Sequence, residues 1–165
     1  MPDAFDLIER YRAKGILVDA NLLLLYFVGK FDSNGISTFK RTSQFNAEDF
    51  NLLDRLLKLF KRVVTTPNVL AEVNSLSGQW GEPAKSKYFQ RFASEIETVE
   101  EEYIQSRVAG REPLFVRVGL TDTTIALAAH DRYLVLTDDF KLAQLLEHRG
   151  LAVLNFNHIR AFAWE

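Results

Sequence analysis

The sequence predicts one α/β domain, in which a mostly parallel central sheet of four to five strands carries helices on both faces. Two observations support this fold class. Short apolar segments alternate along the chain with amphipathic segments of helical periodicity, as in repeated βα units. The chain has 165 residues, a length typical of a single domain, and it contains no internal repeat, low-complexity tract or linker.

The first expected strand lies between two helices. Asp3 to Lys14 has apolar residues at helical spacing and stops at Gly15, a residue that commonly ends helices. Ile16 to Val18 is an uninterrupted apolar run, as in a strand buried on both faces. A Leu-rich helix is expected from about Asn21 to Val28, and the composition of Gly29 to Phe45 predicts a surface loop with room for a short hairpin.

The next unit repeats this arrangement. Asn46 is a suitable N-cap for a helix in which apolar residues recur at i, i+3, i+4 and i+7 from Leu53. A second strand is expected at Arg62 to Thr66. Thr66-Pro67 then begins another helix, because Thr caps free amides and Pro at the first helical position loses no hydrogen bond; this helix contains Glu72.

The second half of the chain should begin with a polar break and a long helix. The break falls at Ser77 to Pro83, and from Ala84 an apolar face at helical spacing extends as far as Tyr103. An Ala-rich helix is expected to begin at Thr121-Asp122-Thr123-Thr124 and to run to about His130.

Two further strands complete the expected sheet. Tyr133 to Leu136 predicts the third strand, and Thr137-Asp138-Asp139 opens a helix that ends at Gly150. Leu151 to Phe156 predicts the fourth strand.

Composition excludes several classes of function. The chain has no Cys, which rules out disulfide scaffolds, Cys-ligated zinc, iron–sulfur clusters and thiol nucleophiles. Its net charge of −2 provides no global positive field, so a nucleic acid would have to be held locally or through bound cations. The longest apolar run, Ala20 to Val28, is too short to cross a bilayer, and the start is acidic, unlike a signal peptide. We therefore expect a cytoplasmic protein that does not bind membranes.

Carboxylates follow the predicted strands at the edge where ligands bind in open α/β sheets. They are Asp19, Glu72, Asp122, Asp138 and Asp139. Converging carboxylates repel one another and are stable together only if protons or cations neutralise them. Mg²⁺ or Mn²⁺ would fit, because these ions prefer oxygen ligands and are commonly also coordinated by substrate phosphates. The chemistry indicated is metal-assisted attack of water on a phosphodiester.

Each carboxylate also has a purely structural interpretation. Asp122 and Asp138 fall in first helical turns, where the backbone amides and the helix dipole favour a carboxylate. Glu72 could be a solvated helix residue. Asp19 is harder to explain in this way, because it ends a fully apolar strand and would be costly to bury without a partner.

Four short segments resemble the signature segments of PIN-domain nucleases, in the same order, between Ile16 and Gly150. They read ILVDANLLL, TTPNVLAEV, GLTDTTIALAA and VLTDDFKLAQLLEHRG. PIN proteins are metal-dependent ribonucleases with a parallel sheet, and many bacterial members are the toxin of a toxin–antitoxin pair. The resemblance implies a Mg²⁺- or Mn²⁺-dependent endoribonuclease that acts on RNA, with an antitoxin protein as a candidate partner.

The resemblance also assigns roles to individual residues. It places the four acidic ligands on Asp19, Glu72, Asp122 and Asp139. Asn21 matches a polar residue two positions after the first Asp and could orient Asp19 or a metal-bound water, and Thr137 could orient Asp139. Asp138 is an additional carboxylate that ranks below Asp139, although either could face the ions.

Rival interpretations come from other classes of protein. A haloacid-dehalogenase-type phosphatase needs a second Asp two residues after the first, where this chain has Asn21. A receiver domain needs a Lys after a late strand, where this chain has Asn157-His158. A PIN-like module that binds nucleic acid or protein without hydrolysis remains an alternative.

Other candidate features are weaker. Local basic groups could hold phosphates, but charged residues on amphipathic helices usually form solvated faces; they are Lys40-Arg41, Lys58/Lys61/Arg62, Lys85/Lys87/Arg91 and Arg107/Arg111/Arg117. His130, His148 and His158 lack ligand-like spacing. Trp80 could stack on a base, and Trp164 is expected to pack the C-terminal tail onto the sheet or a partner. The Phe and Leu excess fits a core first and a homodimer face second.

Overall fold

A five-stranded, all-parallel sheet forms the centre of the protein, and its strand order is β3-β2-β1-β4-β5. The computed structural model describes residues 3–163. Ile16 pairs with both Val63 and Leu134, which places β1 between β2 and β4. The strands are β1 (Ile16–Val18), β2 (Val63–Thr65), β3 (Glu100–Glu101), β4 (Leu134–Thr137) and β5 (Val153–Asn155). The predicted α/β class with a parallel sheet is confirmed.

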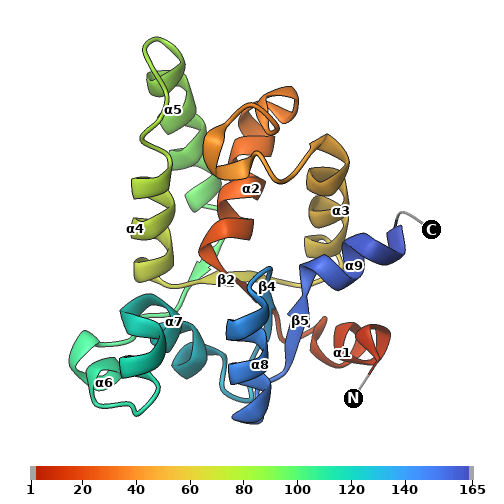
Figure 1. The fold of residues 1–165 in the computed structure, drawn as a ribbon, viewed down its shortest axis with the longest axis vertical. Coiled ribbons are helices and arrows are strands. Elements are labelled where there is room, and N and C mark those ends of the chain that lie inside the picture. Colours follow the sequence, from red (N-terminus) through yellow and green to blue (C-terminus); the bar gives the residue numbers. More distant parts are fainter. Residues whose placement is uncertain (1–2, 164–165) are drawn as a thin grey trace.

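Helices connect the strands and form two groups, with α2, α3, α4 and α5 in the upper half of Figure 1 and α1, α6, α7 and α8 in the lower half. Their bounds are α1 (Ala4–Tyr11), α2 (Ala20–Phe31), α3 (Ala47–Leu57), α4 (Pro67–Leu76), α5 (Ala84–Ile96), α6 (Ser106–Gly110), α7 (Phe115–Ala129), α8 (Phe140–His148) and α9 (Phe156–Ala163). Within residues 3–163, we find no helix that combines the length and the apolar character needed to cross a membrane.

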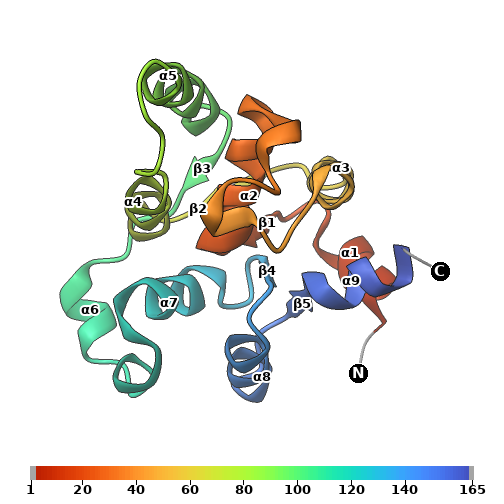
Figure 2. The ribbon, with the colours of Figure 1, turned by 45° about the horizontal axis from the view of Figure 1, so that its top comes forward.

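Helix α2 is the centre of the upper group (Figure 2). It packs against α3, α4 and α5. The side chains of residues 22–25 are fully buried, because each side of the helix faces another element. The Leu-rich sequence of this segment, which lacks a polar stripe, follows from that position.

The helix starts predicted at Asn46 and at Thr66-Pro67 are confirmed by their caps. Asn46 and Asp49 form a reciprocal capping box at the start of α3. The Thr66 hydroxyl accepts a hydrogen bond from the Val69 amide at the start of α4, and Pro67 is the first helical residue.

The Gly29 to Phe45 segment differs from its prediction as a surface loop. Its first residues extend α2 to Phe31, and two 3-10 turns follow, Ser33–Gly35 and Lys40–Thr42. Ile36, Phe39 and Phe45 are buried in the core. These three apolar residues are widely spaced in a segment of mainly polar composition, so the sequence did not indicate that they pack into the core and fix the segment against the domain.

The helix predicted to extend to Tyr103 ends at Ile96 and is followed by the short edge strand β3, and Tyr103 is exposed. The C-terminal helix α9 was not predicted. Trp80 does not offer a free face for a base, because its ring stacks on Phe39 at 4.9 Å between centroids and on Tyr88 at 5.6 Å. Trp164 lies outside the described residues.

The strand order places a topological switch point between β1 and β4. From β1 the chain proceeds outward to β2 and β3, and it then returns to add β4 and β5 on the other side. Neighbouring connections at such a point diverge and leave a crevice at the carboxyl ends of the strands. The residues that follow β1 and β4 are Asp19 and Asp138.

Candidate functional site

Asp19 is held at the end of β1 as the N-cap of α2. Its Oδ1 accepts a hydrogen bond from the Leu22 amide at 3.2 Å, and its Oδ2 accepts one from the Thr137 hydroxyl at the end of β4. The residue is only 6% exposed. The structure thus shows both an N-cap role and a buried carboxylate at the switch point.

Burial is the largest cause that raises the pKa of Asp19 from 3.8 to about 8, and the charges of Asp138 and Asp122 act in the same direction. The hydrogen bonds from Thr137 and Leu22 act in the opposite direction, because they stabilise the charged form. Without a neighbouring cation, this carboxyl is therefore mainly protonated at neutral pH.

Among the acidic side chains, Asp138 has the largest effect on the pKa of Asp19. One carboxylate oxygen, Oδ2, accepts a hydrogen bond from Gln44 Nε2 at 3.2 Å, whereas Oδ1 is buried without a partner. Burial raises the pKa of Asp138, as does the charge of Asp139, whereas the charge of Arg160 lowers it. Asn21 lies exposed on the first turn of α2, and its expected role of orienting Asp19 or a metal-bound water stays a prediction.

Asp139 caps helix α8. Its Oδ1 accepts hydrogen bonds from the amides of Lys141 at 2.8 Å and Leu142 at 3.0 Å. Its own amide donates to the Thr137 hydroxyl at 3.0 Å. Thr137 thus donates to the Asp19 carboxylate and accepts from the backbone of Asp139, and its expected role of orienting the Asp139 side chain stays a prediction.

Asp122 and Glu72 approach from α7 and α4. Burial first, and then the charges of Glu72 and Asp139, raise the pKa of Asp122 to about 6. Gly119 has a φ of 81° and interrupts α7, so Asp122 lies in the first turn after the break. Glu72 is exposed on the second turn of α4.

Two threonines fasten α4 to α7 beneath these acids. The hydroxyls of Thr66 and Thr124 lie 3.2 Å apart in a buried hydrogen bond. Thr124 also donates to the carbonyl oxygen of Thr121 at 2.7 Å. Sequence reasoning recognised Thr66 only as a cap and missed this link, because nothing in the sequence pairs residues so far apart.

The structure brings the five predicted carboxylates to the same edge of the sheet. The charges of Asp138 and Asp122 raise the pKa of Asp19, and those of Glu72 and Asp139 raise the pKa of Asp122. Within residues 3–163, none of them forms an ion pair with Lys or Arg, whereas Asp49 pairs with Arg160 and Glu102 with Arg132. A gathering of acids without basic partners is an environment that a cation would stabilise.

The donor set fits a hard divalent ion. The available ligands are carboxylate oxygens, and the buried Oδ1 of Asp138 lacks a partner. No group of three or more His, Cys, Asp or Glu side chains in residues 3–163 lies at the separation of a formed metal cluster. A shared ion would therefore require rotation of side chains, for which the exposed Glu72 has the freedom, whereas the Asp139 carboxylate is held by two amides of α8.

The basic groups noted in the sequence lie almost entirely at exposed positions. Several of the predicted basic groups contain a residue that pairs with an acid, such as Lys58 with Asp54 at 2.6 Å and Arg91 with Glu95 at 2.9 Å. These pairs agree with solvated helix faces. All three histidines are exposed.

Comparisons with known proteins leave the family open. No family model matches the chain, and no curated protein matches it. Among solved structures, a domain of a functionally unknown protein from Methanocaldococcus jannaschii DSM 2661 aligns with 87% of this chain and 91% of its own, at 17% identity and a TM-score of 0.47.

Proposed function

We propose that this protein is a Mg²⁺- or Mn²⁺-dependent endoribonuclease of the PIN type. The observation that carries the proposal is the buried Asp19 at the switch point, with a pKa raised to about 8 by burial and by neighbouring acids. A carboxylate in such a place is costly unless it serves a ligand or a reaction. The resemblance of four sequence segments to PIN nucleases agrees with this assignment.

The carboxylates would divide the work of holding the ions. Asp19 and Asp138 would supply oxygens from the ends of adjacent strands, and Asp122, Glu72 and Asp139 would add theirs. Bound divalent ions lower the pKa of an attacking water and stabilise negative charge on phosphoryl oxygens. Thr137 keeps Asp19 oriented, and α2 excludes water from the apolar side of this carboxylate.

The proposal is tested with purified protein, a fluorescent single-stranded RNA and added Mn²⁺ or Mg²⁺. We expect cleavage that EDTA abolishes and that Asp19→Asn or Asp122→Asn reduces by at least a hundredfold. Asp6→Asn, an exposed substitution on α1, is the matched control and should leave cleavage unchanged. Full activity in both site variants, or activity in EDTA, would overturn the mechanism. RNA binding without cleavage would indicate the non-catalytic module instead.

The finer proposal is that the enzyme is a toxin restrained by an antitoxin protein. It rests on the sequence resemblance. Induced expression should slow growth, and Asp19→Asn should remove this effect. Normal growth with abundant active enzyme would rule the toxin role out.

A further inference from the structure

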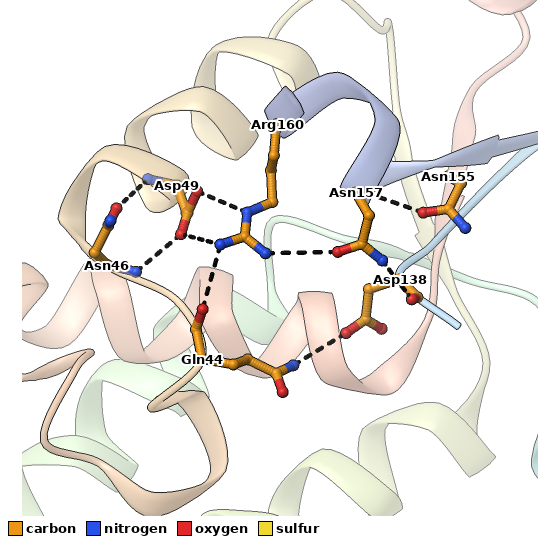
Figure 3. A network of polar contacts seen from close by, with 7 residues as sticks. All are labelled: Gln44, Asn46, Asp49, Asp138, Asn155, Asn157 and Arg160. Atoms are coloured by element: carbon orange, nitrogen blue, oxygen red, sulfur yellow. Dashed lines mark hydrogen bonds and ion pairs between the residues drawn. The ribbon is translucent and has the colours of Figure 1, made fainter. Parts of the chain in front are cut away.

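A network of polar contacts connects Asp138 to two distant parts of the chain (Figure 3). Gln44, which precedes α3, donates from Nε2 to Asp138 Oδ2 at 3.2 Å. Asn157 on α9 donates from Nδ2 to the main-chain oxygen of Asp138 at 2.7 Å. Both the carboxylate and the backbone of this residue are therefore fixed from outside its own strand.

Gln44 is itself held in place by Arg160. The Arg160 Nη2 donates to the Gln44 carbonyl oxygen at 3.2 Å, and its guanidinium forms a two-point ion pair with Asp49, at 2.8 Å from Nε to Oδ1 and 2.9 Å from Nη2 to Oδ2. Asp49 is 1% exposed and also closes the capping box of α3 with Asn46. The guanidinium lies over the Phe45 ring at 5.0 Å. These contacts define the position of the Gln44 backbone.

The network leaves Asp138 with one occupied and one unoccupied oxygen. Oδ2 faces Gln44, and Oδ1 is buried without a partner. Asp139 differs, because it is exposed and its Oδ1 serves two amides of α8. Of these adjacent acids, Asp138 is the one whose orientation is set by other elements.

We propose that Gln44 is a positioning residue, which fixes Asp138 so that Oδ1 binds a divalent cation together with Asp19. The inference rests on the proposed function and deepens it. Hydrogen bonds to the outer side of metal-binding carboxylates orient the ligand, and their loss typically lowers metal affinity by about 10–100-fold. The polar segment after α2 thus has a role at the site, since it carries Gln44 to Asp138.

The test is a Mn²⁺ titration followed by electron paramagnetic resonance, in which free Mn²⁺ gives a sharp signal and bound Mn²⁺ a broadened one. Gln44→Met keeps the length of the side chain but cannot donate, and we expect the Kd for Mn²⁺ to rise by about tenfold. Gln90→Met, at an exposed position on α5, is the matched control and should bind as the wild type does. Arg160→Lys retains the charge beside Asp49 but not the fork that reaches Gln44, so it should weaken binding less.

The readouts separate positioning from a structural role. Gln44 is exposed, so Gln44→Met should leave the melting temperature unchanged while it alters the spectrum of bound Mn²⁺. RNA cleavage by this variant should require more Mn²⁺ and should recover at saturation. Unchanged Mn²⁺ affinity would overturn the inference and leave the nuclease proposal standing. Weakened Mn²⁺ binding in a protein that cleaves no RNA would support the inference and overturn the nuclease, and no Mn²⁺ binding by the wild type would overturn both.

Discussion

Replacing Asp19 with Asn should change how the stability of the metal-free protein depends on pH. The pKa of Asp19 is raised from 3.8 to about 8 in the folded protein, so the folded state retains a proton that the unfolded state releases. Stability contributed by this group is complete below pH 4 and is lost as the pH rises toward 8. Asn removes the ionisation and keeps the shape of the side chain.

The size of the effect follows from the two pKa values. Each pH unit between them changes the free energy of unfolding by about 1.4 kcal/mol when one proton is involved. Asp122, with a pKa of about 6, contributes in the same direction but only below pH 6. From pH 6 to pH 8 the wild type should therefore lose about 2–3 kcal/mol through Asp19 alone.

Urea denaturation in EDTA at pH 5, 6, 7 and 8 measures this difference. We expect the wild type to lose stability throughout this range, whereas Asp19→Asn should lose it only up to about pH 6. The histidines are present in both proteins and cancel in the comparison. Equal slopes for the two proteins between pH 6 and pH 8 would refute the burial argument.

Four further changes test other contacts. Asp122→Asn should make the loss of stability between pH 5 and pH 6 shallower in the same denaturation series, with the remaining loss due to Asp19, and an unchanged slope there would contradict the raised pKa of Asp122. Thr137→Val should cost about 1–3 kcal/mol in urea denaturation, because it leaves the buried Asp19 oxygen without its donor; a neutral result would show that water replaces the hydroxyl. Arg160→Ala should cost about 3–5 kcal/mol, since it leaves Asp49 buried and unpaired, and Arg160→Lys should cost less. Mn²⁺ at a hundred times its Kd should stabilise the wild type by about 2.7 kcal/mol with release of protons, and EDTA should reverse the shift in melting temperature.

Local chemistry explains which parts of the fold could be predicted from the sequence. The segments at Ile16, Leu134 and Val153 are short apolar runs, and each forms a parallel strand as expected. Asn46 and Thr66 begin helices because their side chains satisfy free amides within three residues. Such signals need only neighbouring residues.

The missed elements depend on distant contacts. The strand β3 has two residues, both acidic and exposed, so it carries no hydrophobic pattern and exists only because β2 offers it a hydrogen-bonding edge. Helix α9 is held through Arg160, whose partner Asp49 is far away in the sequence. The local periodicity of the sequence predicts neither the β2–β3 pairing nor the Arg160–Asp49 contact.

The acidic site was predictable in composition but not in its internal arrangement. Strand ends identified Asp19 and the pair at 138 and 139, because parallel strands bring their carboxyl ends to one edge. The sequence ranked Asp139 above Asp138, and the structure shows different surroundings for each: Asp139 caps α8, and Asp138 contacts Gln44. That distinction depends on a residue 94 positions away, which no motif identifies.

The enclosed position of α2 has a consequence for the motions of the site. The side chains of Leu22 to Leu25, which follow Asp19 in α2, are fully buried, so we expect the amides of these turns to exchange their hydrogens with deuterium more slowly than those of exposed segments. Glu72 lies at the surface and can change rotamer on the nanosecond scale. One wall of the site is thus held rigidly, and the opposite wall can adjust to whatever enters.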